Sequence, residues 1–524
     1  MVIYQIYPRS FNDSNGDGIG DLEGVIKKLD YLQDLGVNAI WLCPCYKSPN
    51  RDNGYDVADY RDIMDEFGTM DSALKLISEM KKRGMTLIMD LVPNHTSDQH
   101  KWFVESRKSK DNPYSDYYYW FDEPINDWLA SFGGSVWQYD ETRGQYYMHS
   151  YTAGQPDLNW TNPRVIKEMQ DVVDFWVNLG VGGFRIDVID QISKDFDGVG
   201  YPGGRNCFGP ELHNYINQLF GRKETEHIFT VGECWAGTID EIKRHIGADR
   251  GELSTLFQFD HLDCGRDDKF TKKPDSLKSL RNILVKWQNL MQENDLLHSL
   301  FTDNHDNSPF ISRMGDTEAK RYETATCIAA MVYLLKGVPF VYQGQEFGTV
   351  APEYKSIDSF DDVESFNAYN EYIKSGLTPE QAVEKINFGS RDNSRRPIAW
   401  NSSEGRGFSS AKPWIEHNSH SSEINLENDQ SSDKSVFSFY KSLLGLRNKY
   451  SALRQGSFKC ISDEEDSFFM FERALDGDVF TVICNFESES EIPLTEACKT
   501  LLLSNLGRDG SDVFKPYEIA VYKN

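Results

Sequence analysis

The sequence predicts an α/β protein built on a closed parallel (β/α)₈ TIM barrel. Two observations carry this prediction: eight short apolar runs recur along the chain, and amphipathic helical stretches separate them. Strands that alternate with helices are typical of parallel sheets, because a parallel pair needs a crossover connection. Eight such units are the number that closes this barrel. An open doubly wound sheet is the alternative, but no G-x-G-x-x-G loop follows the first run.

The expected strands are the apolar runs themselves. In chain order they are residues 2–8, 38–44, 86–93, 182–188, 227–233, 256–260, 298–304 and 339–345. Helices are expected between them, among others at 21–36, 70–84 and 164–180. Each of these three has apolar residues at three- and four-residue intervals and ends at a glycine, which is typical of a helix C-terminus.

Two connections are far longer than the few residues usual in compact domains, namely 96–163 and 346–434. The first is rich in tyrosine, tryptophan and aspartate and is interpreted as an inserted subdomain. After about residue 452 the pattern changes to short alternating strands. The predicted domains are a catalytic barrel at 1–95 and 164–451, the insertion at 96–163, and a C-terminal antiparallel β-sandwich at 452–524.

The composition bears on which partners the protein can bind and on the cellular compartment in which it is expected. The formal net charge of −27 argues against nucleic acid and anionic membranes, which repel an acidic surface. No apolar stretch approaches the ~20 residues of a membrane span, and the N-terminus lacks the basic region of a secretory signal. Nine scattered cysteines, an odd number, indicate reduced thiols. We therefore expect a cytoplasmic protein that is a monomer or a weak homo-oligomer.

Polar side chains gather at the ends of the expected strands. They are Tyr7, Arg9, Asp90, Asn94, His95, Arg185, Asp187, Glu233, His305 and Asp306. The carboxyl ends of barrel strands meet on one face, where active sites are built. Carboxylates brought together raise one another's pKa unless a cation, a histidine or catalysis uses them. A two-metal site is the alternative, but no H-x-H or H-x-x-x-H spacing is present.

Acid–base chemistry at a sugar explains this set better. Glycoside cleavage needs one carboxylate as nucleophile or base and one protonated carboxyl as acid. An arginine beside the nucleophilic carboxylate keeps that group ionised. A less solvated, more apolar environment around the other carboxyl favours its protonated form.

Five motifs then resemble the α-amylase superfamily (glycoside hydrolase family 13), and within it the oligo-1,6-glucosidase and dextran-glucosidase branch. They are DLVPNHTS (90–97), QPDLNW (155–160), GFRIDVID (183–190), VGECW (231–235) and TDNHDNSP (302–309). The resemblance runs nearly the whole length of the chain. It implies a retaining exo-α-glucosidase without an organic cofactor, acting on small oligosaccharides.

The resemblance also implies a role for each matching residue. Asp187 would be the nucleophile, Glu233 the general acid/base, and Asp306 the third carboxylate. His95, Arg185 and His305 would line the same sugar pocket, and Tyr55 would stack beneath the sugar. Asp52 in DNGYD (52–56) and Arg391 in SRDN (390–393) would close the pocket over the non-reducing end.

The loop DSNGDGIGD (13–21) places oxygen ligands at every second position, as a calcium loop does. It is not an EF-hand, because its twelfth position, residue 24, is glycine. The resemblance implies one structural Ca²⁺ or Mg²⁺, and the expected ligands are Asp13, Asn15, Asp17, the carbonyl of Ile19, and Asp21. A turn held by its own hydrogen bonds, without metal, is the alternative.

Val188 bears on the linkage that is cleaved. In the resembling enzymes, valine after the nucleophile goes with α-1,6 and sucrose-type substrates and threonine with α-1,4. We therefore expect hydrolysis of isomaltose-like oligosaccharides. A sucrose or isomaltulose-type hydrolase or isomerase, or an α-1,4-active maltase, is the alternative, and Asn307-Ser308-Pro309 departs from the usual run at this point. A trehalose-6-phosphate hydrolase and a non-catalytic binding protein of the same fold are further alternatives; the latter would lack one or more of the three carboxylates.

Overall fold

The computed structural model describes residues 1–198, 204–248, 251–494 and 498–524. The chain divides into two compact units, and each is described by itself. The first unit comprises Met1–Gly20, Lys27–Ala39 and Gln258–Asn524. The second unit comprises Asp21–Ile26 and Ile40–Phe257.

The second unit contains five strands of a parallel sheet. They are β2 (Ala39–Leu42), β5 (Thr86–Leu91), β9 (Gly183–Ile186), β10 (Phe229–Gly232) and β11 (Thr255–Leu256), in the order β11-β10-β9-β5-β2. The register places Arg185 opposite Asp90 on one side and Val231 on the other. Nearly every residue of these strands is buried, as in parallel sheets covered on both faces.

The first unit contains three more parallel strands, β1 (Ile3–Ile6), β14 (Ser299–Leu300) and β15 (Val338–Tyr342), in the order β1-β15-β14. All eight expected strands are therefore strands in the described chain. The observed strands are shorter than the apolar runs, because the runs continue into loops. β11 and β14 have only two residues each.

Two of the three helices expected between strands are single helices. α3 (Met70–Lys82) starts at a capping box on Thr69, and α5 (Pro163–Leu179) starts at the cap Asn162 and ends at Gly180 with φ 105°. The stretch 21–36 instead forms α1 (Leu22–Lys27) and α2 (Leu29–Leu35), because Lys28 between them has φ −106°. The break places the Lys28 ammonium 3.8 Å from the centre of the Trp400 ring.

The insertion has a small core of its own. Its strands β6 (Trp120–Phe121), β7 (Trp137–Asp140) and β8 (Gln145–Met148) form an antiparallel sheet in the order β6-β8-β7, preceded by α4 (Lys101–Ser106). Tyr119, Ala130, Val136, Trp137 and Met148 pack together there. Many of the aromatic residues of this segment therefore serve packing.

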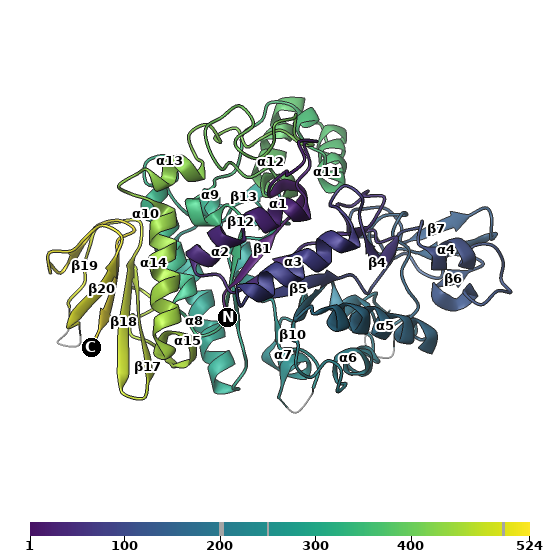
Figure 1. The fold of residues 1–524 in the computed structure, drawn as a ribbon, viewed down its shortest axis with the longest axis horizontal. Helices are drawn as coiled ribbons and strands as arrows, with labels where there is room; N and C mark the ends of the chain where they lie inside the picture. The colour runs from purple at the N-terminus through teal and green to yellow at the C-terminus, as the bar shows by residue number, and fades with distance from the viewer. Residues whose placement is uncertain (199–203, 249–250, 495–497) are drawn as a thin grey trace. The chain divides into compact units, whose positions relative to one another are not determined.

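The C-terminal part of the first unit is an antiparallel sheet, as expected (Figure 1). Its order is β16-β17-β18-β22-β20, with bounds Ser457–Cys460, Phe468–Leu475, Asp478–Asn485, Ile519–Lys523 and Thr500–Ser504. A two-residue turn joins β17 to β18, and Asp476 and Gly477 both have positive φ, 52° and 89°. Such turns match the twist of a hairpin. The predicted domain boundaries stay a prediction.

The remaining elements complete the two units. In the second unit they are β3 (Tyr46–Lys47), β4 (Asp59–Ile63), α6 (Leu212–Phe220) and α7 (Ile239–Ile246). In the first they are β12 (Arg266–Asp268), β13 (Thr271–Lys272), α8 (Leu277–Glu293), α9 (Ile311–Met314), α10 (Arg321–Tyr333), α11 (Val363–Lys374), α12 (Pro379–Gly389), α13 (Leu426–Gln430), α14 (Val436–Lys449), α15 (Ser451–Gln455), β19 (Ser490–Glu491) and β21 (Val513–Phe514). None of the described helices is long and apolar enough to cross a membrane.

Candidate active site

One guanidinium holds three carboxylates at the strand ends of the second unit. Arg185 Nη1 lies 2.8 Å from Asp90 Oδ1 and 2.8 Å from Asp187 Oδ1, and its Nη2 pairs with Glu233 Oε2. Asp90 and Arg185 lie on β5 and β9, while Asp187 and Glu233 follow β9 and β10 directly. All four are buried, which makes Coulomb interactions among them strong.

Burial opposes the ionisation of two carboxyls in this cluster. Burial raises the pKa of Asp90 to about 6, and burial also raises the pKa of Asp187 well above its ordinary value, against the opposing effect of Arg185. The charges of Glu233 and Asp90 raise the pKa of Asp187 further. Three carboxyls cannot all ionise around one cation in a dry site. The cluster can therefore offer both an ionised carboxylate and a proton donor.

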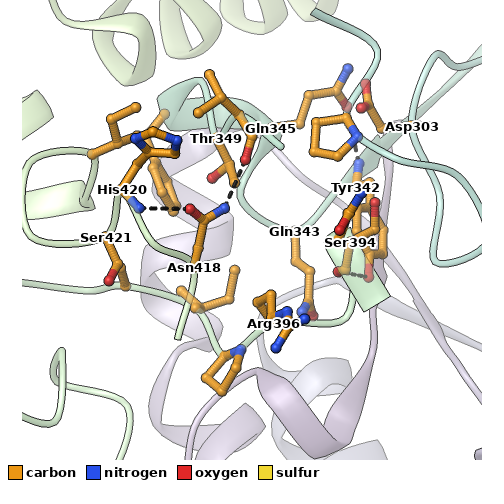
Figure 2. A pocket seen from close by; sticks show the side chains of 18 residues that line it. Asp303, Tyr342, Gln343, Gln345, Thr349, Ser394, Arg396, Asn418, His420 and Ser421 are labelled. Carbon is orange, nitrogen blue, oxygen red and sulfur yellow. Dashed lines mark hydrogen bonds between the residues drawn. The ribbon is translucent and has the colours of Figure 1, made fainter. Parts of the chain in front are cut away.

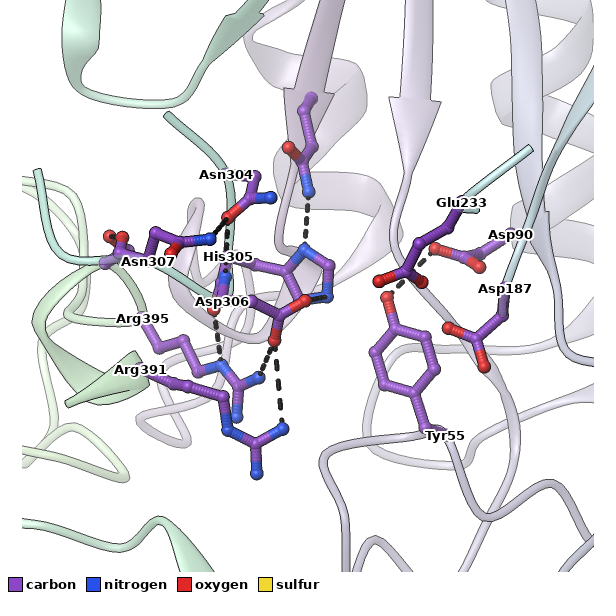
Figure 3. Close-up of polar contacts among 12 residues, drawn as sticks. Tyr55, Asp90, Asp187, Glu233, Asn304, His305, Asp306, Asn307, Arg391 and Arg395 are labelled. Carbon is purple, nitrogen blue, oxygen red and sulfur yellow. Dashed lines mark hydrogen bonds and ion pairs between the residues drawn. The ribbon is translucent and has the colours of Figure 1, made fainter. Parts of the chain in front are cut away.

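Aromatic and imidazole groups surround the cluster within the second unit. The Tyr55 hydroxyl donates to Asp90 Oδ2 at 3.0 Å (Figure 3). Trp41 Nε1 donates to the same oxygen at 3.1 Å. The His95 Nδ1 atom lies 3.1 Å from Asn94 Nδ2, and its Nε2 lies 3.0 Å from the Tyr55 carbonyl. The amide must donate to Nδ1, so the proton of His95 sits on Nε2. Burial lowers the pKa of His95, which keeps the ring neutral.

Val188 has a left-handed backbone, with φ 33° and ψ 51°. A β-branched residue rarely adopts this conformation, which costs about 1–3 kcal/mol and recurs at functional sites. The strain turns the chain sharply after Asp187 and directs the Val188 N–H at Glu233 Oε2, 3.3 Å away.

Further hydrogen bonds hold the Glu233 backbone. Its N–H donates to the Ile186 carbonyl at 2.8 Å, and its carbonyl accepts from Ile189 N–H at 3.0 Å. Cys234 Sγ lies 3.8 Å from His245 Nε2, while His245 Nδ1 donates to the Glu241 carbonyl at 2.8 Å. The Cys234 thiol therefore donates to His245 and anchors the chain after Glu233.

Asp52 is buried beside the same group. Its Oδ2 accepts from Gln155 Nε2 at 3.0 Å, and its N–H donates to Asp56 Oδ1 at 3.1 Å. Gln155 begins the QPDLNW motif, so the insertion helps to orient Asp52.

The first unit carries a second polar group, centred on Asp306 after β14. His305 Nε2 lies 3.1 Å from Asp306 Oδ2, and Gln5 Nε2 lies 2.8 Å from His305 Nδ1. Arg395 Nη2 donates to Asp306 Oδ1 at 2.8 Å, and Arg391 Nη1 is 3.8 Å away (Figure 3). Burial acts to raise the pKa of Asp306, but His305, Arg395 and Arg391 outweigh it and hold that pKa well below its usual range.

Arg391 is fixed by a buried carboxylate. Its Nε and Nη2 both donate to Asp362 Oδ1, at 2.9 and 2.5 Å. Arg395 Nε donates to the His305 carbonyl at 2.8 Å, so it supports both His305 and Asp306. Asp52 belongs to the second unit and Arg391 to the first, and the clamp between them stays a prediction.

Sequence reasoning missed four residues of these groups: Trp41, Tyr151, Asp362 and Arg395. Tyr151 faces the charges of Asp187 and Glu233, and its hydroxyl accepts from Gln191 Nε2 at 3.0 Å. Arg395 was visible as the second basic position in SRDNSRRP. Asp362 carried no signal, because it lies in a long polar segment far from every motif.

A cavity of about 40 Å³ lies within the first unit, with space for one or two water molecules (Figure 2). Asp303, Asn393, Ser394 and Arg396 are among the residues that line it, and none of the residues assigned to catalysis does. Asn393 Nδ2 donates to Ser308 Oγ at 3.1 Å, and Ser394 Oγ donates to the Asn307 carbonyl. This wall therefore supports the segment after Asp306.

The loop 13–21 is held by its own hydrogen bonds. Asp13 accepts from the N–H groups of Asn15, Gly16 and Gly18 at 2.7–3.0 Å, and from Ser409 Oγ at 2.5 Å. These bonds outweigh burial and lower the pKa of Asp13. Asp17 accepts from Ile19 N–H, and Asp21 from Gly24 N–H. The oxygens are of the kind that Ca²⁺ and Mg²⁺ prefer, but in the described chain no three acidic, histidine or cysteine side chains are gathered to hold a metal.

Comparison with known proteins places the chain in a family. The model for the alpha amylase catalytic domain matches residues 5–456. An oligo-1,6-glucosidase of Parageobacillus thermoglucosidasius is 42% identical over 551 residues, which cover 100% of this chain and 98% of that protein. A glucan 1,6-alpha-glucosidase of Streptococcus pneumoniae is 40% identical, with 96% and 94% covered. The solved structure of trehalulose synthase MutB from Pseudomonas mesoacidophila MX-45 superposes with a TM-score of 0.93 at 35% identity, covering 100% and 98%. The chain is a glycoside hydrolase and belongs to the α-amylase family.

Proposed function

We propose that the protein is a retaining exo-α-glucosidase that releases glucose from the non-reducing end of α-1,6-linked gluco-oligosaccharides such as isomaltose. The observation that carries the chemistry is the Arg185 guanidinium, which binds Asp187 through one terminal nitrogen and Glu233 through the other. Carboxyls this close suit a retaining glycosidase, whose two groups are about 5–5.5 Å apart. The linkage is supported by Val188 and by relatives named for 1,6-glucosidic activity.

In this mechanism Asp187 attacks the anomeric carbon while Glu233 protonates the departing glycosidic oxygen. The covalent glucosyl-enzyme ester is then cleaved by water, and Glu233 now takes the proton from that water. Asp306, kept ionised by His305, Arg395 and Arg391, accepts hydrogen bonds from sugar hydroxyls, and these strengthen in the transition state. For Asp52 and Arg391, the resemblance to exo-acting enzymes is what supports a role in admitting only one glucose beyond the cleaved bond.

The proposal also covers the cellular location of the enzyme, its oligomeric state and a bound metal ion. A cytoplasmic location is supported by the nine cysteines, each of which carries a thiol. A monomer or weak homo-oligomer, and a structural Ca²⁺ or Mg²⁺ at residues 13–21, are further parts of the proposal. An isomerase or hydrolase of sucrose-type substrates is the second candidate, because the trehalulose synthase shares the fold over the whole chain.

The test compares glucose release from isomaltose, maltose, sucrose and isomaltulose, with the anomer of the first product followed by NMR. We expect isomaltose to be the best substrate and α-glucose to appear first. Faster turnover of maltose would contradict the linkage, faster turnover of sucrose would favour the second candidate, and initial β-glucose would contradict retention.

A further inference from the structure

Asp190 belongs to the GFRIDVID motif but has no part in the mechanism above. It lies in the 3₁₀ turn Ile189–Gln191, and its side chain is 3% exposed. It does not cap this turn, which has Val188 at its N-cap and no capping hydrogen bond from a side chain. The turn is joined to Glu233 by the Ile189 N–H described above.

The Asp190 carboxyl contacts the chain just after Glu233. It interacts with the backbone N–H of Trp235, two residues after Glu233. Its Oδ1 atom is buried and has no hydrogen-bond partner among the residues that the structure describes. A buried carboxylate in this state is costly, so a chain retains one only where some other gain offsets it.

Among the residues that the structure describes, no cation forms an ion pair with Asp190. The titratable groups around it are Glu233, Lys194, Tyr151, Cys207 and Cys234. Lys194 is engaged elsewhere: its Nζ lies 2.7 Å from Asp157 Oδ2 and 2.7 Å from Asn94 Oδ1. Burial, together with the charge of Glu233, raises the pKa of Asp190 to about 7.

We propose that Asp190 is a positioning residue for the general acid, which orients the Glu233 segment and, through its negative charge, keeps Glu233 protonated toward alkaline pH. Like charges in a buried site disfavour each other's ionised form, so ionised Asp190 opposes loss of the Glu233 proton. The two groups then titrate together, and hydrolysis continues to a higher pH than Glu233 alone would allow. This inference rests on the proposed function, since it takes Glu233 as the acid.

The experiment measures kcat/KM against pH for the wild type, Asp190→Asn and the control Asp174→Asn. Asp174 pairs with Arg222 on the surface of the same unit, so the control removes one negative charge far from any catalytic role. The substrate is whichever of the four disaccharides the wild type hydrolyses fastest, which keeps the result independent of the linkage. We expect the alkaline limb of Asp190→Asn to move to lower pH by about half a unit or more, while the control keeps the wild-type profile.

A uniform loss of activity with an unmoved alkaline limb would overturn the inference and leave Asp190 a structural residue. Hydrolysis of none of the four substrates by the wild type would overturn the proposed function instead, and the inference with it. Thermal unfolding at pH 8 checks the fold of the variant. Since Asp190→Asn removes a buried negative charge that burial disfavours, we expect its Tm to equal or exceed that of the wild type. A second variant, Asp190→Glu, restores the charge and is expected to return the limb toward the wild-type pH.

Discussion

At the scale of single residues, the central feature of the site is Arg185, whose guanidinium contacts three carboxyls. Its two terminal nitrogens reach these three carboxyls, while burial raises the pKa values of Asp90 and Asp187. In the proposed mechanism, the nucleophile and the acid therefore share one guanidinium. The group around Asp306 has the opposite balance, because two arginines and a histidine face one carboxylate.

The variant Asp187→Asn is expected to lose activity without losing stability. We expect kcat to fall roughly a thousandfold or more, since an amide cannot form the glucosyl ester. The melting temperature should stay the same or rise, because burial already disfavours the ionised Asp187. Turnover of a disaccharide and thermal unfolding measure the two effects. Activity near the wild-type level would show that Asp187 is not the nucleophile.

Val188→Thr tests the linkage preference with little change in shape. Threonine is also β-branched, so the strained backbone at φ 33° is preserved, and a hydroxyl replaces a methyl. We expect the ratio of kcat/KM for isomaltose to that for maltose to fall about five- to tenfold, equivalent to about 1 kcal/mol. Val188→Ala, which adds no hydroxyl, is the control; an equal shift in both variants would refute the hydrogen-bonding explanation.

At the scale of elements, the strands were easier to predict than the helices and loops around them. Each expected strand is a continuous apolar run, and burial on both faces makes such a run hard to mistake. The break at Lys28 had no signal, because the apolar periodicity of 21–36 continues across it. The short strands β3, β4, β12 and β13 were missed as well, since their polar sequences gain their partners only in the folded chain.

The loop 13–21 carries a prediction about metal binding. If it holds Ca²⁺ or Mg²⁺, a chelator should lower the melting temperature, because a ligand that binds only the folded state stabilises it. Added Ca²⁺ should restore the value. Asp13→Ala loses the hydrogen bonds in either case and serves as the reference for a loop already weakened. An unchanged Tm in the chelator would favour the loop held by its own hydrogen bonds.

At the scale of the whole molecule, buried carboxylates set the dependence of stability on pH. Burial raises the pKa values of Asp56 and Asp90 to about 6 and that of Asp190 to about 7. A raised pKa stabilises the fold at low pH, and this stability is lost as the pH rises through 6–7. Charge partners instead lower the pKa values of Asp306 and Asp362, whose stabilisation is lost in acid.

We therefore expect the melting temperature to rise as the pH falls from 8 to about 5, and to drop below about pH 4. The net charge of −27 acts in the same direction over the first interval, because self-repulsion weakens on approach to the isoelectric point. Thermal unfolding at high salt screens that repulsion and leaves the contribution of the buried groups. A Tm that is flat from pH 5 to 8 at high salt would contradict the raised pKa values.

The sequence by itself determined the eight strands, the parallel barrel class, and which residues stand at the strand ends, because apolar runs and the chemical types that follow them are local properties of the chain. Only the tertiary structure decided that one guanidinium contacts three carboxyls, that Asp362 and Arg395 support Arg391 and Asp306, and that Asp190 Oδ1 is buried without a hydrogen-bond partner among the described residues. These facts depend on which side chains, distant in the sequence, pack together in the interior away from water. The burial of each group and the balance of charges around it arise from this packing, so they cannot be predicted from the spacing of residues along the chain.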